Sequence, residues 1–384
     1  MKAANKSLPI SGLSGNEIYC LHRLGYSPAE ILIGNSVFSL GLLGSITAGF
    51  RGLVGGEIVE YTKIISEGRH LALKRLESEL KSHNGIGATS VTSELIFHVG
   101  NVEFLSVGSS LFSENPQKTF TSSGTGQDLF CQIDAHYRPI KFALGNVAYS
   151  IGIGRGIRGS FRTLARGEVK DFSDIFNTTR HRALQRLVQE AEEVGANSVV
   201  GINTSIIPFG TIGVQEMVMI GTASHNPYLP EEPGQKVVTS DLTNDEMWSL
   251  AQIGLAPRSL LLSTSVYSLG VIGGIASIIK SFVRGEISQL TSLIYEAREN
   301  ALDGLRRQAQ AIGATNVVGT QTHIYHLGGG LIEFLALGTA VQPVGSEMKP
   351  AHDSLPAQAI IRDQDTFINT TRSERATDLT SVRR

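Results

Sequence analysis

Cysteine and charge are both scarce in this chain. Only two cysteines, Cys20 and Cys131, occur among its 384 residues, which is too few for a disulfide framework and favours a reducing cytoplasm. Charged residues make up 18% of the chain and the net charge is −2, so no general attraction to nucleic acid follows. The first sixteen residues hold no apolar run of the kind that a secretory signal needs. These absences predict a cytoplasmic protein that does not bind nucleic acid.

Motifs of catalysis and metal binding are absent as well. The chain has no Cys-x-x-Cys, no His-Glu-x-x-His, no EF-hand loop, no Walker loop and no dinucleotide fingerprint. Its ten histidines form no recurring set, because His70 and His181 match where a third repeat has Glu299. His323 and His326 are close in sequence, yet a strand would point them to opposite faces. We therefore expect no enzyme, no cofactor and no metal site within one chain.

What the chain does have is a set of residues that occurs three times. Each copy has a Gly-Glu pair, an Arg twelve residues after the Glu, a Gly-Ala pair, and a strand with one Glu. From Glu57 to Glu168 is 111 positions and from Glu168 to Glu286 is 118, a period that suits small tandem domains. The three sets are Gly56-Glu57, Arg69, Gly87-Ala88 and Glu103; Gly167-Glu168, Arg180, Gly195-Ala196 and Glu216; and Gly285-Glu286, Arg298, Gly313-Ala314 and Glu333.

Matching the copies outward from the Gly-Glu pair predicts three domains and a tail. Breaker-rich segments separate the domains. After Gly345 the chain turns polar, with Phe367 as its one aromatic residue, so residues 345–384 are expected to be disordered. The predicted domains are residues 14–113, 124–226 and 243–342.

The same order of elements is expected in every domain. In the first, apolar runs at residues 17–21 and 30–33 predict an opening hairpin. A short glycine-rich helix, a long helix that begins at the Gly-Glu pair, and two closing strands follow. This order predicts an α+β fold with helices layered on an antiparallel sheet. The expected glycine-rich helices lie at residues 36–54, 147–165 and 265–283.

Two uncharged runs, residues 31–50 and 259–279, are long enough to span a membrane. The matching segment of the second copy carries four arginines, which a bilayer would not accept without partners. We therefore expect buried or interfacial helices. The spacing of the arginines puts them on one helix face, which would suit an anion or a lipid head group, or a solvated face or interface. They are Arg155, Arg158, Arg162 and Arg166.

Short motifs appear in the same order along the domains. Examples are Leu144-Gly145-Asn146, Gly55-Gly56 followed by Tyr61, Ala297-Arg298-Glu299, Ile312-Gly313-Ala314-Thr315-Asn316-Val317-Val318-Gly319 and Gly338-Thr339-Ala340. This ordered set resembles the YbjQ-like family, small bacterial domains labelled as heavy-metal-binding, over nearly all of residues 14–342. The chain departs from the family pattern where an Arg after Gly-Gly is replaced by Glu57, Glu168 and Glu286.

The resemblance implies a dodecin-like α+β fold and a ring of five domains, with the chain itself as its partner in a homo-oligomer. It implies a metal through the family label alone. Five is not a multiple of three, so whole chains cannot fill one such ring. Five chains stacking three rings, a pentamer, is the favoured arrangement; two chains giving six domains, or copies packing within one chain, are the alternatives.

A charged residue recurs on the apolar face of each long helix. Arg180 lies between Phe176 and Ala183 in a stripe of helical spacing, and a buried guanidinium needs a partner. The single Glu of the last strand shares a face with apolar residues, so we expect it to supply that partner, within a domain or across an interface. Such a pair would be structural; the alternative is an anion-binding or proton-handling pair facing a ring lumen. The residues are Arg69, Arg180 and Arg298, with Glu103, Glu216 and Glu333.

Three further carboxylates, those of Glu57, Glu168 and Glu286, stand where the long helices are expected to begin. A carboxylate there complements the helix dipole and its unpaired amides, so we expect helix capping.

The sequence therefore predicts a non-enzymatic, self-assembling scaffold of three YbjQ-like domains. One alternative is a metal-binding or small-anion-binding protein whose sites form between subunits. The other is a protein attached peripherally to a membrane surface.

Overall fold

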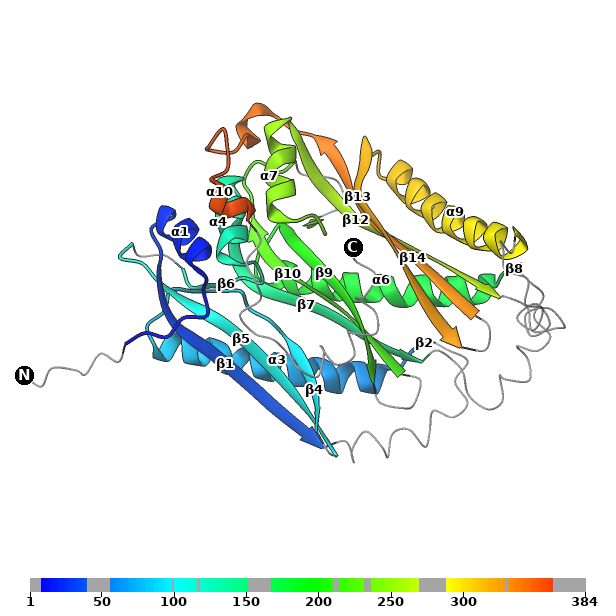
Figure 1. The fold of residues 1–384 in the computed structure, drawn as a ribbon, viewed down its shortest axis with the longest axis horizontal. Helices are drawn as coiled ribbons and strands as arrows, with labels where there is room; N and C mark the ends of the chain where they lie inside the picture. The colour runs from blue at the N-terminus through cyan, green and yellow to red at the C-terminus, as the bar shows by residue number, and fades with distance from the viewer. Residues whose placement is uncertain are drawn as a thin grey trace, which may run out of the picture.

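The chain folds into three α+β units, each with its own sheet and long helix (Figure 1). This confirms the predicted fold class. The expected glycine-rich helices lie mostly outside the described residues. The structure, a computed structural model, describes residues 8–39, 56–98, 100–115, 118–150, 167–209, 214–230, 236–268, 288–328 and 331–361.

Every unit has a short helix, a long strand, a long helix and a closing antiparallel pair of strands, which is interrupted in the first unit. In unit one these are α1 (Gly15–Arg23), β1 (Ser27–Ser39), α3 (Val59–Ser82), β3 (Gly87–Thr89), β4 (Glu94–His98) and β5 (Asn101–Phe112). In unit two they are α4 (Gly126–Asp134), β7 (Arg138–Ser150), α6 (Lys170–Glu193), β9 (Ser198–Phe209) and β10 (Val214–His225). In unit three they are α7 (Asn244–Gln252), β12 (Leu255–Ser268), α9 (Ser288–Ala311), β13 (Asn316–Gly328) and β14 (Leu331–Pro343).

The predicted opening hairpin is wrong in its first half, because residues 17–21 belong to helix α1. A capping box starts this helix: the Ser14 side chain accepts from the Glu17 amide, and the Glu17 side chain accepts from the Ser14 amide. Thr125 and Thr243 start α4 and α7 in the same way. The second apolar run does form a strand, within β1.

The end of the long helix corrects the alignment of the Gly-Ala pairs. The helices of units one and two begin 111 positions apart, and those of units two and three 118 apart. At these offsets the counterparts of Gly195 and Gly313 are Asn84 rather than Gly87, and all three have positive φ, at 74°, 65° and 54°. Asn adopts this left-handed conformation more readily than most residues, so it can replace Gly after a helix.

Sheets and long helices alternate along the molecule. Helix α3 packs on β1 and β5 of its own unit and on β7 of the next, and α6 packs on β7 and on β12. Figure 1 shows α3 along the lower edge, α6 across the middle and α9 at the upper right. Helix α9 packs on its own strands β12 and β14. The units are therefore joined side by side by one repeated helix-to-sheet contact.

Short strands reinforce this lateral packing. The strand β2 (Gly56–Glu57) precedes α3 but pairs with β7 of unit two, and β8 (Gly167–Glu168) precedes α6 but pairs with β12 of unit three. The linkers add β6 (Phe120–Thr121), which pairs with β3, and β11 (Val238–Thr239), which pairs with β9. A stack of three rings from five chains would place the three units of one chain in different rings. The side-by-side packing seen here corresponds instead to the alternative in which the copies pack within one chain.

Part of the expected disordered tail is folded. Residues 346–348 form a 3-10 turn and α10 (Ala357–Ile360) follows, packed against α1 and α4. Met348 and Ala359 are buried in the apolar cluster between the short helices. His352 donates from Nδ1 to Asp134 Oδ1 at 2.5 Å. Two apolar side chains and polar anchors hold residues 346–361, and residues 362–384 lie outside the described part of the chain.

Each long helix lies so close to its own sheet that one partner must be glycine. A Cβ on Gly145 would lie 2.1 Å from the Ala183 carbonyl oxygen, and one on Gly34 would meet Ala72 at the same distance. In unit three the strand has Ser263 instead, and the glycine moves to the helix, where a Cβ on Gly304 would lie 1.9 Å from Ser263 Oγ. The glycine changes sides but the close approach is kept.

This close approach makes Gly145→Ala a test of the packing. The added methyl would meet backbone atoms of α6, which cannot rotate away, so we expect a loss of about 1–3 kcal/mol in the free energy of unfolding. Denaturant unfolding of both variants gives the measurement, with Gly15→Ala as the control because its Cβ would meet nothing within 4 Å. Equal stabilities of the two variants would contradict the close approach.

Candidate functional site

The recurring arginine of unit one pairs with the recurring glutamate of unit two. Arg69 donates from Nε to Glu216 Oε1 at 2.9 Å and from Nη2 to Oε2 at 2.7 Å, and both side chains are fully buried. Its Nη1 donates to the Ser93 carbonyl oxygen at 2.8 Å, and Asn146 Nδ2 donates to Glu216 Oε1 at 3.1 Å. This two-point geometry satisfies a buried charge pair with groups from α3, β7, β10 and the loop before β4, in two units.

The arginine of unit two repeats this contact with unit three. Arg180 donates from Nε to Glu333 Oε1 at 2.7 Å, and Thr264 Oγ1 donates to the same oxygen at 3.2 Å. The guanidinium also lies over the rings of Tyr149, Phe176 and Tyr325, with centroid distances of 5.6 to 5.7 Å. Burial is the largest single effect and lowers the pKa of Arg180. The Glu333 charge, the hydrogen bond to Glu333 and the nearby Tyr149 and Tyr325 together outweigh it and raise the pKa above its usual value.

The third arginine and the first glutamate are not brought together. Arg298 of α9 is exposed, at the opposite end of the row of units from Glu103. Glu103 accepts hydrogen bonds from Asn35 Nδ2 at 3.1 Å and His98 Nε2 at 2.7 Å, and these bonds lower its pKa. Two of the three expected pairs therefore form, each between neighbouring units. Glu103 of unit one and Arg298 of unit three are not paired with each other.

The carboxylates expected to cap the long helices have other partners. The N-caps of α3 and α6 are Ile58 and Val169, and neither makes a side-chain capping bond. Glu57 instead accepts from Arg182 Nη1 at 2.9 Å and Arg186 Nη2 at 2.6 Å, both in unit two. Glu168 accepts from two serine hydroxyls, those of Ser173 and Ser265. Both glutamates lie in the short strands that cross to the next unit, and Glu286 lies outside the described residues.

A histidine adds a titratable contact between the first two units. His70 of α3 bonds through Nε2 to Glu190 of α6, and through Nδ1 to the Ser66 carbonyl oxygen. The other oxygen of Glu190 accepts from the Leu144 amide at 3.1 Å. The hydrogen bond to Glu190 raises the pKa of His70 above 6.5, although burial opposes the shift. No residue feature singled out this pair in the sequence, because Glu190 lies 120 positions away.

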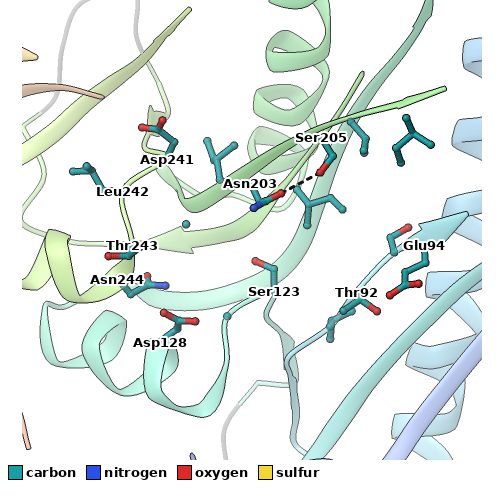
Figure 2. A pocket seen from close by; sticks show the side chains of 18 residues that line it. Thr92, Glu94, Ser123, Asp128, Asn203, Ser205, Asp241, Leu242, Thr243 and Asn244 are labelled. Atoms are coloured by element: carbon teal, nitrogen blue, oxygen red, sulfur yellow. Dashed lines mark hydrogen bonds between the residues drawn. The ribbon is translucent and has the colours of Figure 1, made fainter. Parts of the chain in front are cut away.

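A pocket of about 480 Å³, lined by both polar and apolar side chains, lies where unit one meets the other two. Figure 2 shows Glu94, Asp128 and Asp241 around it, together with Asn244 at the start of α7. Burial raises the pKa of Asp241, whose Oδ1 accepts from Thr339 Oγ1 at 2.5 Å. The Asn244 Oδ1 is buried without a hydrogen-bond partner among the described residues. Carboxylates without a basic side chain make this pocket unsuited to an anion.

Three sites weighed in the sequence analysis are a metal site, a membrane span and the arginine stripe. Within the described ranges, no group of three His, Cys, Asp or Glu side chains could hold a metal ion. None of the helices there combines the length and apolar character needed to cross a membrane. The arginine stripe of Arg155, Arg158, Arg162 and Arg166 lies outside the described residues.

Fold and contacts together define the class: a tandem array of α+β domains in which each buried arginine is completed by the next domain. The family model described as "Putative heavy-metal-binding" (YbjQ_1) matches residues 26–96, 135–226 and 258–343, once in each unit. The chain belongs to this family, as three tandem copies.

Similar proteins include short and long members. The chain is 27% identical over 237 residues to the Mycobacterium tuberculosis protein named "Encapsulin nanocompartment protein Rv1762c", covering 60% of this chain and 88% of that one. It is 39% identical over 79 residues to a UPF0145 protein of Thermotoga maritima, and 34% identical over 80 residues to one of Thermosipho melanesiensis. Each of these two alignments covers 21% of this chain, and 74% and 73% of those proteins respectively. No solved structure matches the chain.

The buried pair gives a mutational prediction. Arg69→Met leaves Glu216 buried without its cation, so we expect a loss of about 3–5 kcal/mol in the free energy of unfolding. The double variant Arg69→Met, Glu216→Leu removes both charges and should regain most of that loss. Denaturant unfolding of the two variants and the wild type measures this coupling. If the double variant loses as much as the single one, the pair does not account for the stability.

The His70 contact predicts a pH dependence with a definite sign. The pKa of His70 is raised in the folded protein, so its contribution to stability is complete below pH 6.5 and is lost as pH rises through the raised value. Thermal unfolding midpoints of the wild type and of His70→Gln, measured across this range, should converge at high pH and separate at low pH. A constant separation would argue against the His70–Glu190 contact, and an NMR titration of the His70 ring provides an independent measurement.

Proposed function

We propose that this protein is a non-enzymatic, self-assembling scaffold. The observation that carries the proposal is the use of its recurring charged residues. Arg69 and Arg180 each form a buried ion pair with a glutamate of the following unit. Glu57 of unit one likewise forms an ion pair with Arg186 of unit two. These charges neutralise one another across the boundaries between units, and the Arg69 and Arg180 side chains are fully buried, whereas a reaction site needs groups that a substrate can reach.

The alternatives receive less support from the described residues. A small anion has no basic side chain to meet in the pocket, where Glu94, Asp128 and Asp241 stand. A metal site between subunits would need ligands from more than one chain, and its main support is the description of the family as heavy-metal-binding. Attachment to a membrane surface depends on the arginine stripe, which the described ranges do not include.

A relative adds support from another direction. The name of the Mycobacterium tuberculosis protein refers to an encapsulin nanocompartment, and the alignment covers 88% of that protein. A scaffold role for the present chain agrees with that name.

The scaffold proposal predicts that the native protein contains several chains. One chain has a mass of 41.2 kDa, so native mass spectrometry and light scattering should give a multiple of that mass at micromolar concentration. The full chain should be purified without an affinity tag, so that metal analysis of the same sample also examines the family label. A single-chain mass at every concentration reached would reject the proposal.

A further inference from the structure

The first sheet of the row has an uncovered face. Ile33 and Val37 of β1 are 51% and 57% exposed. Their counterparts in unit two are Leu144 and Ala148, and those in unit three are Leu262 and Val266. All four counterparts are at most 1% exposed, because the long helix of the preceding unit covers them. Among the described residues no long helix covers β1 on this side, and the same strand positions are apolar and exposed.

The last helix of the row has the matching uncovered face. Arg298 of α9 is exposed, whereas Arg69 and Arg180 at the same helix position are fully buried. Leu290 and Ile294 lie two turns and one turn before Arg298, respectively, and are half-buried. Their counterparts in α3 and α6 are buried against the next sheet. The face that α3 and α6 present to the following unit is thus also present on α9, where none of the described elements covers Arg298.

The charge that Arg298 needs is in place at the other end. Glu103 lies directly opposite Val37 in the β1–β5 register, as Glu216 lies opposite Ala148 and Glu333 opposite Val266. Asn35 donates to Glu103 at 3.1 Å, the same bond and length with which Asn146 holds Glu216. The acceptor half of the ion pair is therefore preformed in unit one.

The strand edges repeat this complementarity. At an offset of 111, Phe120–Thr121 of β6 correspond to Pro9 and Ile10, which precede β1. Ile10 accepts from the Ile31 amide at 2.8 Å and is 68% exposed. β3, the start of β9 and the start of β13 are equivalent in the three units. β3 pairs with β6 and β9 pairs with β11, whereas the start of β13 is partly or fully exposed. Pro9 and Ile10 therefore match the edge that β13 presents.

We propose that the β1 face of one copy docks on α9 of a second copy, with Arg298 of the second copy paired to Glu103 of the first. The inference rests on the proposed scaffold function and specifies its joint. The occupant is a second copy because both faces continue a contact that the chain already makes twice. Such a head-to-tail contact uses two different surfaces, so every added copy presents a fresh end until a ring closes or a filament grows.

One substitution sets this joint apart from the contacts within a chain. Between units one and two, His70 meets Glu190. At the proposed joint the counterpart of His70 is Glu299 in α9 of one copy, and the counterpart of Glu190 is Glu79 in α3 of the other copy. Two carboxylates repel where a histidine and a carboxylate attract. Arg306 lies 3.7 Å from Glu299 and offsets part of this repulsion. The joint is thus weaker than the contacts within the chain, and the assembly should dissociate into folded chains.

Charge reversal tests the joint. Arg298→Glu and Glu103→Arg each place like charges at the joint, and each should raise the concentration for half-assembly more than about tenfold. Arg298 is exposed in the single chain, so its reversal should leave circular dichroism and thermal unfolding of the chain unchanged. An equimolar mixture of the two variants should assemble again, since alternating copies bring reversed charges together at one joint and native charges at the next.

The matched control is Arg307→Glu, which reverses an exposed charge on the same helix whose counterparts Ser78 and Gln189 stay exposed inside the row. It should assemble like the wild type. A wild type that assembles while Arg298→Glu keeps the wild-type mass would overturn this joint and leave the scaffold proposal standing. A wild type that stays a single chain would overturn both.

Discussion

A buried arginine that cannot be satisfied within its own unit is the constraint on which this structure depends. Arg69 and Arg180 have no exposed surface, and the carboxylate that neutralises each belongs to the following unit. An unpaired guanidinium in an apolar interior costs several kcal/mol, so a unit cannot complete its core alone. The helix that carries the arginine must therefore lie between two sheets. The alternation of sheets and helices follows from this requirement.

The apolar cores share the dependence. One cluster combines Phe176 and Leu187 of unit two with Leu262 and Leu335 of unit three, and another combines Leu73 of unit one with Phe142 of unit two. The strands β2 and β8 add backbone hydrogen bonds across the same boundaries. The three units are repeats in sequence, but in packing they form one continuous body. This is how solenoid proteins behave, where stability comes from the interfaces between neighbours as well as from the repeats.

Much of this could be predicted from the sequence, since a charge inside an apolar helical stripe demands a partner and a lone glutamate on an apolar strand face offers one. Which glutamate serves which arginine could not be predicted, because it depends on how units pack and not on spacing along the chain. Glu57 shows the same limit: its arginine partners lie 125 and 129 positions away, so capping the nearest helix was the local interpretation. The missed helix α1 is different, because Ser14 and Glu17 gave a capping signal that outweighed the apolar run.

Carrying three units in one chain changes what assembly costs. In the assembly proposed above, two helix-to-sheet contacts form within the chain, at the high effective concentration that a linker provides, and one contact per chain forms between molecules. Only the contact between molecules is weakened by the loss of translational and rotational freedom on association. It is also the joint where Glu299 replaces a histidine. In that proposal, the differences among the copies, rather than their shared residues, decide how readily the assembly forms and dissociates.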